Sequence, residues 1–293
     1  MMNKENLRNY AGVLIAVLLG LGVAAAGSQG GYKLGSMPIY ALGVLAAFVI
    51  QWLAFIPAYL LKTEKFYDLA GSITYLSVMF LAVALTPVRD LRSWVLLALV
   101  GVWAVRLGSF LFMRIKKAGE DRRFREIKRS FGRFLQAWTL QGLWVTFSLA
   151  AALAVITSQE RVPADAFLVI GVLVWLSGFA VEVTADRQKS RFRADPENQG
   201  QFINTGLWAW SRHPNYFGEI VLWVGVMIIA LPVLRGWQWV SLISPIFITI
   251  LLTRISGVPL LEQRADEKWG GQADYEAYKA STPVLFPRPP KGE

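Results

Sequence analysis

Long apolar stretches, separated by short polar segments, run through the whole chain. The eight stretches lie near residues 10–26, 38–61, 69–86, 92–113, 134–157, 165–184, 216–234 and 237–257. A helix needs about 20 apolar residues to cross the hydrocarbon core of a bilayer. The pattern therefore predicts an all-α, polytopic integral membrane bundle of about eight transmembrane helices, forming a single membrane domain over residues 1–293.

Composition supports a membrane location. Hydrophobic residues make up 55% of the chain and charged residues only 17%, whereas soluble domains carry about 25% charged residues. Twelve tryptophans and nine tyrosines are typical of aromatic belts at the two membrane surfaces. The stretch after residue 23, "AAAGSQGG", superficially resembles a signal-peptide cleavage site. Since seven more apolar segments follow, we expect the first helix to be retained.

The charged loops predict the orientation of the bundle. Segment 114–133 carries nine Lys/Arg against three acids, and segment 186–214 carries five against three. Basic loops lie on the cytoplasmic side, so both termini are expected there too, in a bacterial inner membrane. The same rule accounts for the net charge of +10, so membrane lipids are the expected contacts and nucleic acid is not. The chain has no cysteine and one histidine, so no metal site is expected.

Charged residues within apolar stretches are functional candidates, because burying them in lipid is costly. Arg106 lies near the middle of the fourth stretch and is expected to face the bundle interior, either beside a ligand or in an ion pair with Asp68. Glu182 and Glu219 lie at cytoplasmic ends of stretches, and Glu219 also suits the positive end of a helix dipole. Arg254 lies close enough to the cytoplasmic surface to extend its guanidinium into water.

A second polar region lies at residues 62–77, where the third helix begins. It contains Tyr67, Asp68 and Tyr75, and the last two are seven residues apart and share a helix face. A tyrosine and an acid on one face can donate a proton to a carbonyl. All three are therefore candidate catalytic residues, although a tyrosine at a membrane surface is also common without a catalytic role.

The richest polar region is segment 186–219, which ends in "SRHPNYFGE". An arginine guanidinium can donate two parallel hydrogen bonds to the oxygens of one phosphate. A helix that begins at Pro214 also offers free backbone N–H groups to an anion. Binding of lipid headgroups would explain the arginines of this segment, but it would not explain Asn215, Tyr216 and Glu219. With no GxGxxG or Walker sequence, a nucleotide would have to bind in a membrane-embedded pocket. The candidate cofactor-binding residues are Glu182, Asp186, Arg191, Arg193, Asn204, Arg212, His213, Asn215, Tyr216 and Glu219.

Several of these motifs resemble one known family. "GFAVEVTADRQKSRFR", "ENQGQFINTGLWAWSRHPNYFGEIVLWVGV" and "GVPLLEQRADEKWG" are similar to the steroid 5-alpha-reductase superfamily, and to its uncharacterised membrane-reductase branch in bacteria and plants. "KTEKFYDLAGSITY" and "VRLGSFLFMRIKKAGEDRRFREI" extend the likeness to about residues 60–290. The "RHPNYFG" motif alone also resembles isoprenylcysteine carboxyl methyltransferases.

The resemblance implies a seven-helix reductase core plus one helix, with NADPH bound by residues 134–293 and the substrate cavity lined by residues 1–133. Asp186, Arg193, Asn215 and Glu219 match the cofactor-binding motif of the steroid enzymes, whereas Glu182 replaces an asparagine. The residues that match the substrate cavity are Trp103 and Arg106, and Trp103 stands where the steroid enzymes have their proton-donating tyrosine. This departure leaves Tyr67, Asp68 or Tyr75 to polarise the substrate.

Three functions are consistent with the sequence. The first is an NADPH-dependent oxidoreductase that reduces an activated C=C bond, enone-like, in an apolar lipid or steroid-like small molecule. The second is a membrane methyltransferase that uses S-adenosylmethionine, although such enzymes carry adjacent glutamates where this chain has Glu262 and Gln263. The third is a transporter or lipid-binding protein, although transporters tend to show internal repeats and none is evident.

Overall fold

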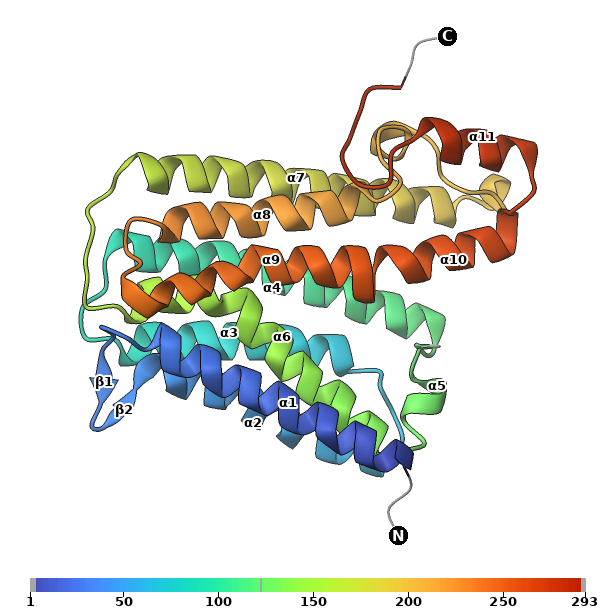
Figure 1. Ribbon diagram of the computed structural model, residues 1–293. Coiled ribbons are helices and arrows are strands. Elements are labelled where there is room, and N and C mark those ends of the chain that lie inside the picture. The colour runs from blue at the N-terminus through green and yellow to red at the C-terminus, as the bar shows by residue number, and fades with distance from the viewer. Residues whose placement is uncertain (1–3, 122, 291–293) are drawn as a thin grey trace. The chain divides into compact units, whose positions relative to one another are not determined.

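The computed structural model describes residues 4–121 and 123–290, and within them the chain is almost entirely helical (Figure 1). The long helices are α1 (Lys4–Gly27), α2 (Ile39–Leu60), α3 (Tyr67–Leu85), α4 (Leu91–Ala118), α6 (Phe131–Thr157), α7 (Ala166–Ala194) and α8 (Pro214–Ala230). Shorter elements are α5 (Phe124–Ile127), α9 (Ile243–Ile250), α10 (Val258–Trp269), α11 (Ala273–Ser281) and a hairpin of β1 (Lys33–Leu34) and β2 (Met37–Pro38). The predicted polytopic helical bundle is confirmed.

Seven segments of the described chain are long and apolar enough to cross a membrane, as in an integral membrane protein. Six are α1 to α4, α6 and α7, and the seventh runs over Gly236–Trp269. The predicted stretch near 216–234 is α8, an apolar helix of 17 residues that is shorter than the other seven. Helix α7 continues to Ala194, ten residues beyond the predicted end, so the basic residues after Asp186 lie on a helix and not in a loop.

The chain forms two compact units. Of the described residues, the N-terminal unit contains 4–121, 123–168 and 230–244, and the C-terminal unit contains 169–229 and 245–290. Helix α6 belongs to the N-terminal unit.

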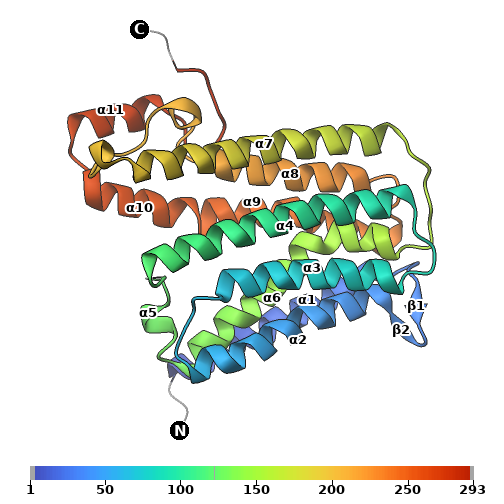
Figure 2. The same cartoon turned by 180° about the vertical axis from the view of Figure 1, so that it is seen from behind.

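The N-terminal unit is built around α6, the most buried of the apolar helices. Residues 149–156 of α6 are fully buried, and Figure 2 shows α2, α3 and α4 with α6 from behind. Polar side chains also join these helices. The Gln51 amide donates to the Thr74 hydroxyl at 2.8 Å, and the Trp52 indole donates to the Thr139 hydroxyl at 3.0 Å. Such bonds connect transmembrane helices where lipid removes the hydrophobic driving force between them.

Two arginines near the junction of α3 and α4 have defined partners in this unit. Arg92 is fully buried, lies 2.9 Å from Asp165 and donates to the carbonyl of Pro163. The guanidinium of Arg89 donates to the carbonyls of Val83 and Ala84 at the end of α3. These contacts give both arginines a structural role.

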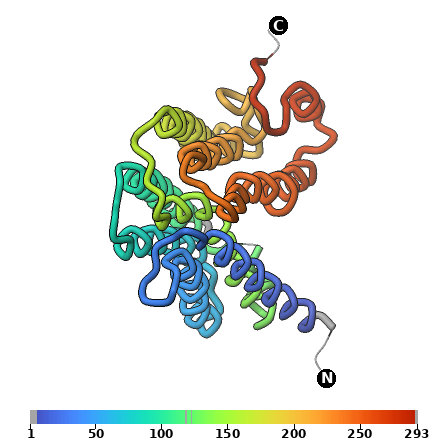
Figure 3. The backbone as a smooth tube through the Cα atoms, turned by 60° about the vertical axis from the view of Figure 1, so that its left-hand side comes forward, coloured from blue at the N-terminus to red at the C-terminus, as the bar shows by residue number. Residues whose placement is uncertain are grey.

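The C-terminal unit depends on a close contact between α7 and α8, which lie side by side in Figures 1 and 3. Gly171 and Gly178 of α7 face Gly225 and Gly218 of α8, respectively, in an antiparallel arrangement. A Cβ on Gly178 would lie 2.6 Å from the carbonyl oxygen of Gly218, and a Cβ on Gly225 would lie 2.7 Å from that of Gly171. Small residues at such positions allow two backbones to approach closely.

The last apolar segment is not one regular helix. It passes from α9 into a π-helical turn at Leu251–Ile255, breaks at Gly257 and resumes as α10. A Cβ on Gly257 would lie 2.3 Å from the Leu252 carbonyl oxygen and 2.9 Å from the Tyr216 ring. The break therefore packs closely against the beginning of α8.

We predict that Gly178→Ala destabilises the protein. The added methyl would meet backbone atoms that cannot move independently, and overpacking of this kind costs about 1–3 kcal/mol. Thermal unfolding of the detergent-solubilised protein measures the effect. Gly22→Ala is the control, because a Cβ there meets nothing within 4 Å; it should leave the melting temperature unchanged or slightly raised. Equal effects of the two substitutions would contradict the close α7–α8 contact.

Candidate functional site

One face of α7 carries a row of charged residues at the polar end of the C-terminal unit. Glu182, Asp186, Lys189 and Arg193 follow one another at intervals of four, three and four residues, which places them along one side of the helix. Glu182 and Asp186 are buried, and Arg193 is exposed in the last turn. Arg191 leaves the opposite side of α7, because two residues correspond to about 200° of helical rotation. Because the helix continues through them, Arg191 and Arg193 point to different sides of α7, although the sequence suggested that they act together.

The beginning of α8 brings a second polar row against the first. The amide nitrogen of Asn215 lies 3.3 Å from a carboxylate oxygen of Asp186. Glu219, one turn further along α8, is also buried, and Gly218 packs against the backbone of Glu182. The glycine contact between the helices therefore gathers Glu182, Asp186, Asn215 and Glu219 into one region.

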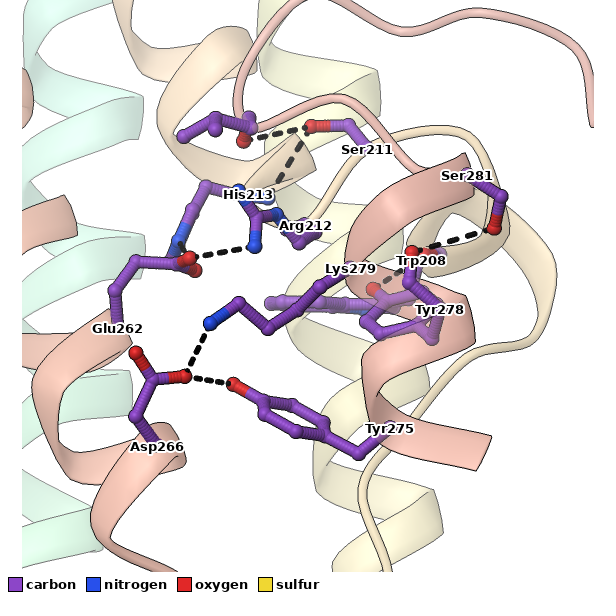
Figure 4. A network of polar contacts seen from close by, with 11 residues as sticks. Trp208, Ser211, Arg212, His213, Glu262, Asp266, Tyr275, Tyr278, Lys279 and Ser281 are labelled. Atoms are coloured by element: carbon purple, nitrogen blue, oxygen red, sulfur yellow. Dashed lines mark hydrogen bonds and ion pairs between the residues drawn. The ribbon is translucent and has the colours of Figure 1, made fainter. Parts of the chain in front are cut away.

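Glu262 of α10 holds the two residues that precede α8. One of its carboxylate oxygens lies 2.7 Å from Nη1 of Arg212, and the other lies 2.8 Å from Nε2 of His213. Figure 4 shows the Glu262 carboxylate between these two side chains. The His213 ring also stacks on that of Tyr216, with ring centroids 5.6 Å apart and an interplanar angle of 8°. Arg212, His213 and Tyr216 are thus fixed in place by contacts from within this unit.

The contact with Glu262 defines the protonation of His213. A carboxylate only accepts hydrogen bonds, so we assign the proton to Nε2 and leave Nδ1 as an acceptor. Burial lowers the pKa of His213 below its usual value of 6.5, against the opposing effect of the hydrogen bond to Glu262. The neighbouring cations Lys189 and Arg212 lower this pKa further. His213 is therefore neutral at pH 7.

Three buried polar atoms in this region have no hydrogen-bond partner among the described residues. They are Nε of Arg212, Nδ1 of His213 and Oδ1 of Asn215, one donor and two acceptors within four consecutive residues, beside Nη1 of Arg212, which lies in the ion pair with Glu262 and makes no hydrogen bond of good geometry. Buried polar atoms are nearly always paired with protein, water or ligand. Three together, on side chains already fixed by Glu262 and Asp186, are typical of a site shaped to bind a polar ligand.

A frame of aromatic and ionic contacts holds the segment that leads into this site (Figure 4). Asp266 accepts hydrogen bonds from Tyr275 at 2.9 Å and from Lys279 at 2.6 Å. Tyr278 donates to the carbonyl of Trp208 at 2.7 Å, and the indole of Trp208 donates to the carbonyl of Ala185. Helices α10 and α11 are thus joined to each other and to the end of α7.

The tail after α11 closes this frame. The backbone N–H of Arg212 donates to the carbonyl of Pro283, and the Ser211 hydroxyl donates to that of Leu285. The N–H of Arg288 donates to the carbonyl of Trp210. Segment 210–212 is consequently paired with a segment more than 70 residues later in the chain.

The remaining candidates are distributed differently. Asn204 and Arg191 are exposed in the C-terminal unit. Tyr67, Asp68, Tyr75, Trp103 and Arg106 belong to the N-terminal unit. The Tyr67 hydroxyl donates to the carbonyl of Ala137 at 2.9 Å, and its ring packs on Trp138. This gives Tyr67 a clear role in joining α3 to α6.

The other N-terminal candidates also have defined surroundings. The carboxylate of Asp68 lies 3.9 Å from the guanidinium of Arg114. The structure therefore shows Asp68 in an ion pair with Arg114, whereas the sequence suggested Arg106. Tyr75 is buried with its ring edge-on to Trp103 at 5.0 Å. Arg106 is half-buried, and its guanidinium lies 5.3 Å from the ring of Phe110. The catalytic roles of Tyr67, Asp68 and Tyr75 stay predictions.

Sequence reasoning did not assign Glu262 or Lys189 to the site. Lys189 lies 4.2 Å above the Trp208 ring and occupies the charged face of α7 between Asp186 and Arg193. Glu262 and Asp266 are one turn apart on an amphipathic helix, a spacing that could have indicated two carboxylates facing the same partner. Nothing local to Glu262, however, indicates that its partners are Arg212 and His213.

A family model described as "Protein of unknown function (DUF1295)" matches residues 54–282 of the chain. The chain belongs to this family. DUF1295 is related to steroid 5-alpha-reductase-like membrane proteins, which agrees with the likeness in the motifs of residues 182–219. Searches of curated proteins and of solved structures found no match.

We predict that Glu262→Ala in this DUF1295 protein lowers the free energy of unfolding by about 1–3 kcal/mol, because it leaves two half-buried to buried donors without their acceptor. Chemical or thermal unfolding in detergent measures the change. Glu267→Ala on the same helix is the control, since the exposed Glu267 carboxylate accepts its hydrogen bond from the exposed Gln263. A control as destabilised as Glu262→Ala would show that α10 tolerates no change rather than that Glu262 is a specific partner.

We also predict that stability falls as the pH drops below about 6.5. In the unfolded chain His213 titrates at its usual pKa of 6.5, and in the folded protein it does so at a lower pH. The unfolded state therefore binds more protons in this window, and acidification favours it. Because the chain has a single histidine, melts between pH 7.5 and 5.5 can be compared with those of His213→Gln, which should show a flatter pH dependence. An unchanged slope in the variant would rule out His213 as the source.

Proposed function

We propose that this DUF1295 protein is a membrane-embedded, NADPH-dependent reductase that reduces an activated C=C bond of an apolar lipid or steroid-like molecule. The observation that carries the proposal is the group of unpartnered buried atoms on Arg212, His213 and Asn215, at the polar end of apolar helices. This arrangement suits a ligand with a polar part that needs specific hydrogen bonds.

The residues fit a phosphorylated dinucleotide in chemical type. Buried Oδ1 of Asn215 and Nδ1 of His213 can accept hydrogen bonds from amide or hydroxyl groups, as on nicotinamide and ribose. Arg193 and Lys189 supply positive charge on the same face of α7, suited to phosphates. The charge of Arg212 is already paired with Glu262. The group that Arg212 can offer to a ligand is therefore its Nε–H, as a hydrogen-bond donor.

The chain's own residues would bind and orient the reactants. NADPH, when bound, supplies a hydride. Asp186 orients the Asn215 amide, and Glu262 keeps the His213 proton on Nε2, so that Asn215 Oδ1 and His213 Nδ1 would both serve as hydrogen-bond acceptors for a bound cofactor. Reduction of a C=C bond also requires a proton, for which Asp68, Tyr75 and Tyr67 are the candidates; Tyr67 would first have to release the carbonyl of Ala137.

A methyltransferase that uses S-adenosylmethionine is the second candidate, because it would use the same "RHPNYFG" segment. Two observations favour the reductase. Gln263 follows Glu262 and bonds Glu267 instead of providing a second adjacent carboxylate. Arg193 and Lys189 place cations where a cofactor without phosphate would not need them.

We predict that purified protein binds NADPH, and that Arg193→Gln weakens this binding about 10- to 100-fold. A hydrogen bond to a charged group contributes about 1.5–3 kcal/mol, which corresponds to this range. Fluorescence titration with NADPH measures the affinity, and NADH and S-adenosylmethionine are titrated in parallel.

The matched control is Arg187→Gln, an exposed arginine on the same helix but on another side of it. It should bind NADPH as the wild type does. Absence of NADPH binding at millimolar concentration, or tighter binding of S-adenosylmethionine, would overturn the reductase proposal.

A further inference from the structure

A basic depression lies in the N-terminal unit, far along the chain from the residues of the proposed cofactor site. It has a volume of about 550 Å³ and is lined by Lys62, Glu120, Arg125, Lys128 and Arg129. Four of these five side chains are cationic. Two chain segments build it, the connection after α2 and the segment between α4 and α6, which includes α5.

A buried carboxylate holds these two segments together. Glu64, with a side chain only 1% exposed, accepts a hydrogen bond from the backbone N–H of Asp121 at 3.0 Å and from Nζ of Lys128 at 2.7 Å. Lys128 is thereby fixed on the wall of the depression instead of extending freely into solvent. The depression is a built feature of the fold.

The other cations are only weakly committed to partners in the protein. Arg125 pairs with Glu120 and Arg129 with Glu126, and all four of these side chains are at least 36% exposed. Exposed pairs of this kind contribute about 0–1 kcal/mol, so a phosphate can compete for the arginines.

Lys62 has the most unusual position of the lining residues. Its ammonium lies 3.5 Å above the ring of Tyr59, and its backbone adopts a φ of 50°, the only positive φ of a non-glycine residue among the described residues. This left-handed residue ends α2, because the N–H of Lys62 donates to the carbonyl of Tyr59 and the N–H of Thr63 to that of Ala58. The backbone turn directs Lys62 to the depression.

An apolar surface adjoins the cations. Leu60 and Leu61, immediately before Lys62, are 72% and 71% exposed. Phe131, two residues after Arg129, is 42% exposed and packs edge-on against Tyr59 at 5.1 Å. Both α2 and α6 are among the apolar helices long enough to cross a membrane, so these side chains lie where the acyl chains of lipids begin.

We propose that this depression binds the phosphate headgroup of an anionic membrane phospholipid, with the acyl chains along Leu60, Leu61 and Phe131. A soluble phosphate would need the cations alone, and the exposed apolar side chains beside them favour a lipid. Basic pockets at the cytoplasmic ends of transmembrane helices suit such headgroups. This proposal does not rest on the reductase proposal, because every residue involved belongs to the N-terminal unit.

The test uses the full-length protein in a neutral detergent, with lipid binding measured by native mass spectrometry and by thermal shift. Phosphatidylglycerol, phosphatidylcholine and glycerol 3-phosphate are the probes. We expect phosphatidylglycerol to bind and to raise the melting temperature, and phosphatidylcholine and glycerol 3-phosphate to do so at least about 10-fold less effectively.

The variant is Lys62→Glu with Arg129→Glu, and the control is Lys116→Glu with Lys117→Glu, which makes the same charge change at exposed positions of α4 outside the depression. The first pair should weaken phosphatidylglycerol binding about 10- to 30-fold, and the control should not. Lys62→Gln with Arg129→Gln repeats the test if the charge reversal fails to fold.

Three results would overturn the proposal. An equal loss of phosphatidylglycerol affinity in both charge-reversal variants would mean that the lipid is attracted to the basic surface in general. Equal effects of glycerol 3-phosphate and phosphatidylglycerol would identify a soluble anion as the ligand. Equal binding of phosphatidylcholine would remove the requirement for an anionic lipid.

Discussion

The C-terminal unit depends on the backbone contact between α7 and α8. Four glycines, spaced seven residues apart on each helix, allow the two backbones to meet without intervening side chains. Transmembrane helices gain little from hydrophobic attraction to one another, so close packing of this kind is a main source of their association. The contact fixes the helices along their length, and therefore determines which residues of α7 oppose which residues of α8.

That alignment produces the candidate site. With Gly178 against Gly218, the next turns bring Glu182 beside Gly218, and Asp186 within 3.3 Å of Asn215. Glu262 then adds Arg212 and His213 from the segment just before α8. Three elements thus bring three buried carboxylates (Glu182, Asp186 and Glu219), the half-buried Asn215 and one neutral histidine together at the end of an otherwise apolar unit. Polar atoms left without protein partners there are the basis of the proposed ligand.

The apolar pattern alone was sufficient to predict the all-α membrane bundle and the position of every long helix. It predicted several helix ends poorly, among them the start of α1 and the ends of α4 and α7, because hydrophobicity marks where a helix leaves the apolar region and not where its hydrogen bonding stops. Residues 185–194 are polar but favour helix, so α7 continues through them to Ala194. Likewise α10 resumes beyond the break at Gly257 as an amphipathic helix.

The sequence predicted which residues form the candidate site but not which residues they contact. The segment from Arg212 to Glu219 is dense in polar residues within an apolar chain, which made it a candidate without any structure. The partners of these residues were not predictable, because Glu262 is separated from His213 by 49 positions and Ala137 from Tyr67 by 70. A single sequence contains no signal for such pairings. Only the fold shows that Arg212 is neutralised by Glu262, or that the Tyr67 hydroxyl is engaged by a backbone carbonyl.

The hydrogen bonds from Ser211, Arg212 and Trp210 to residues 283–288 have a consequence for biosynthesis. The segment before α8 is synthesised about 70 residues ahead of the partners that hold its backbone. During translation, α7 and α8 can associate through their glycines as soon as both are in the membrane. Segment 210–212 cannot form these hydrogen bonds until residues 283–288 have been synthesised. Assembly of this candidate site therefore has to follow the synthesis of residues 283–288.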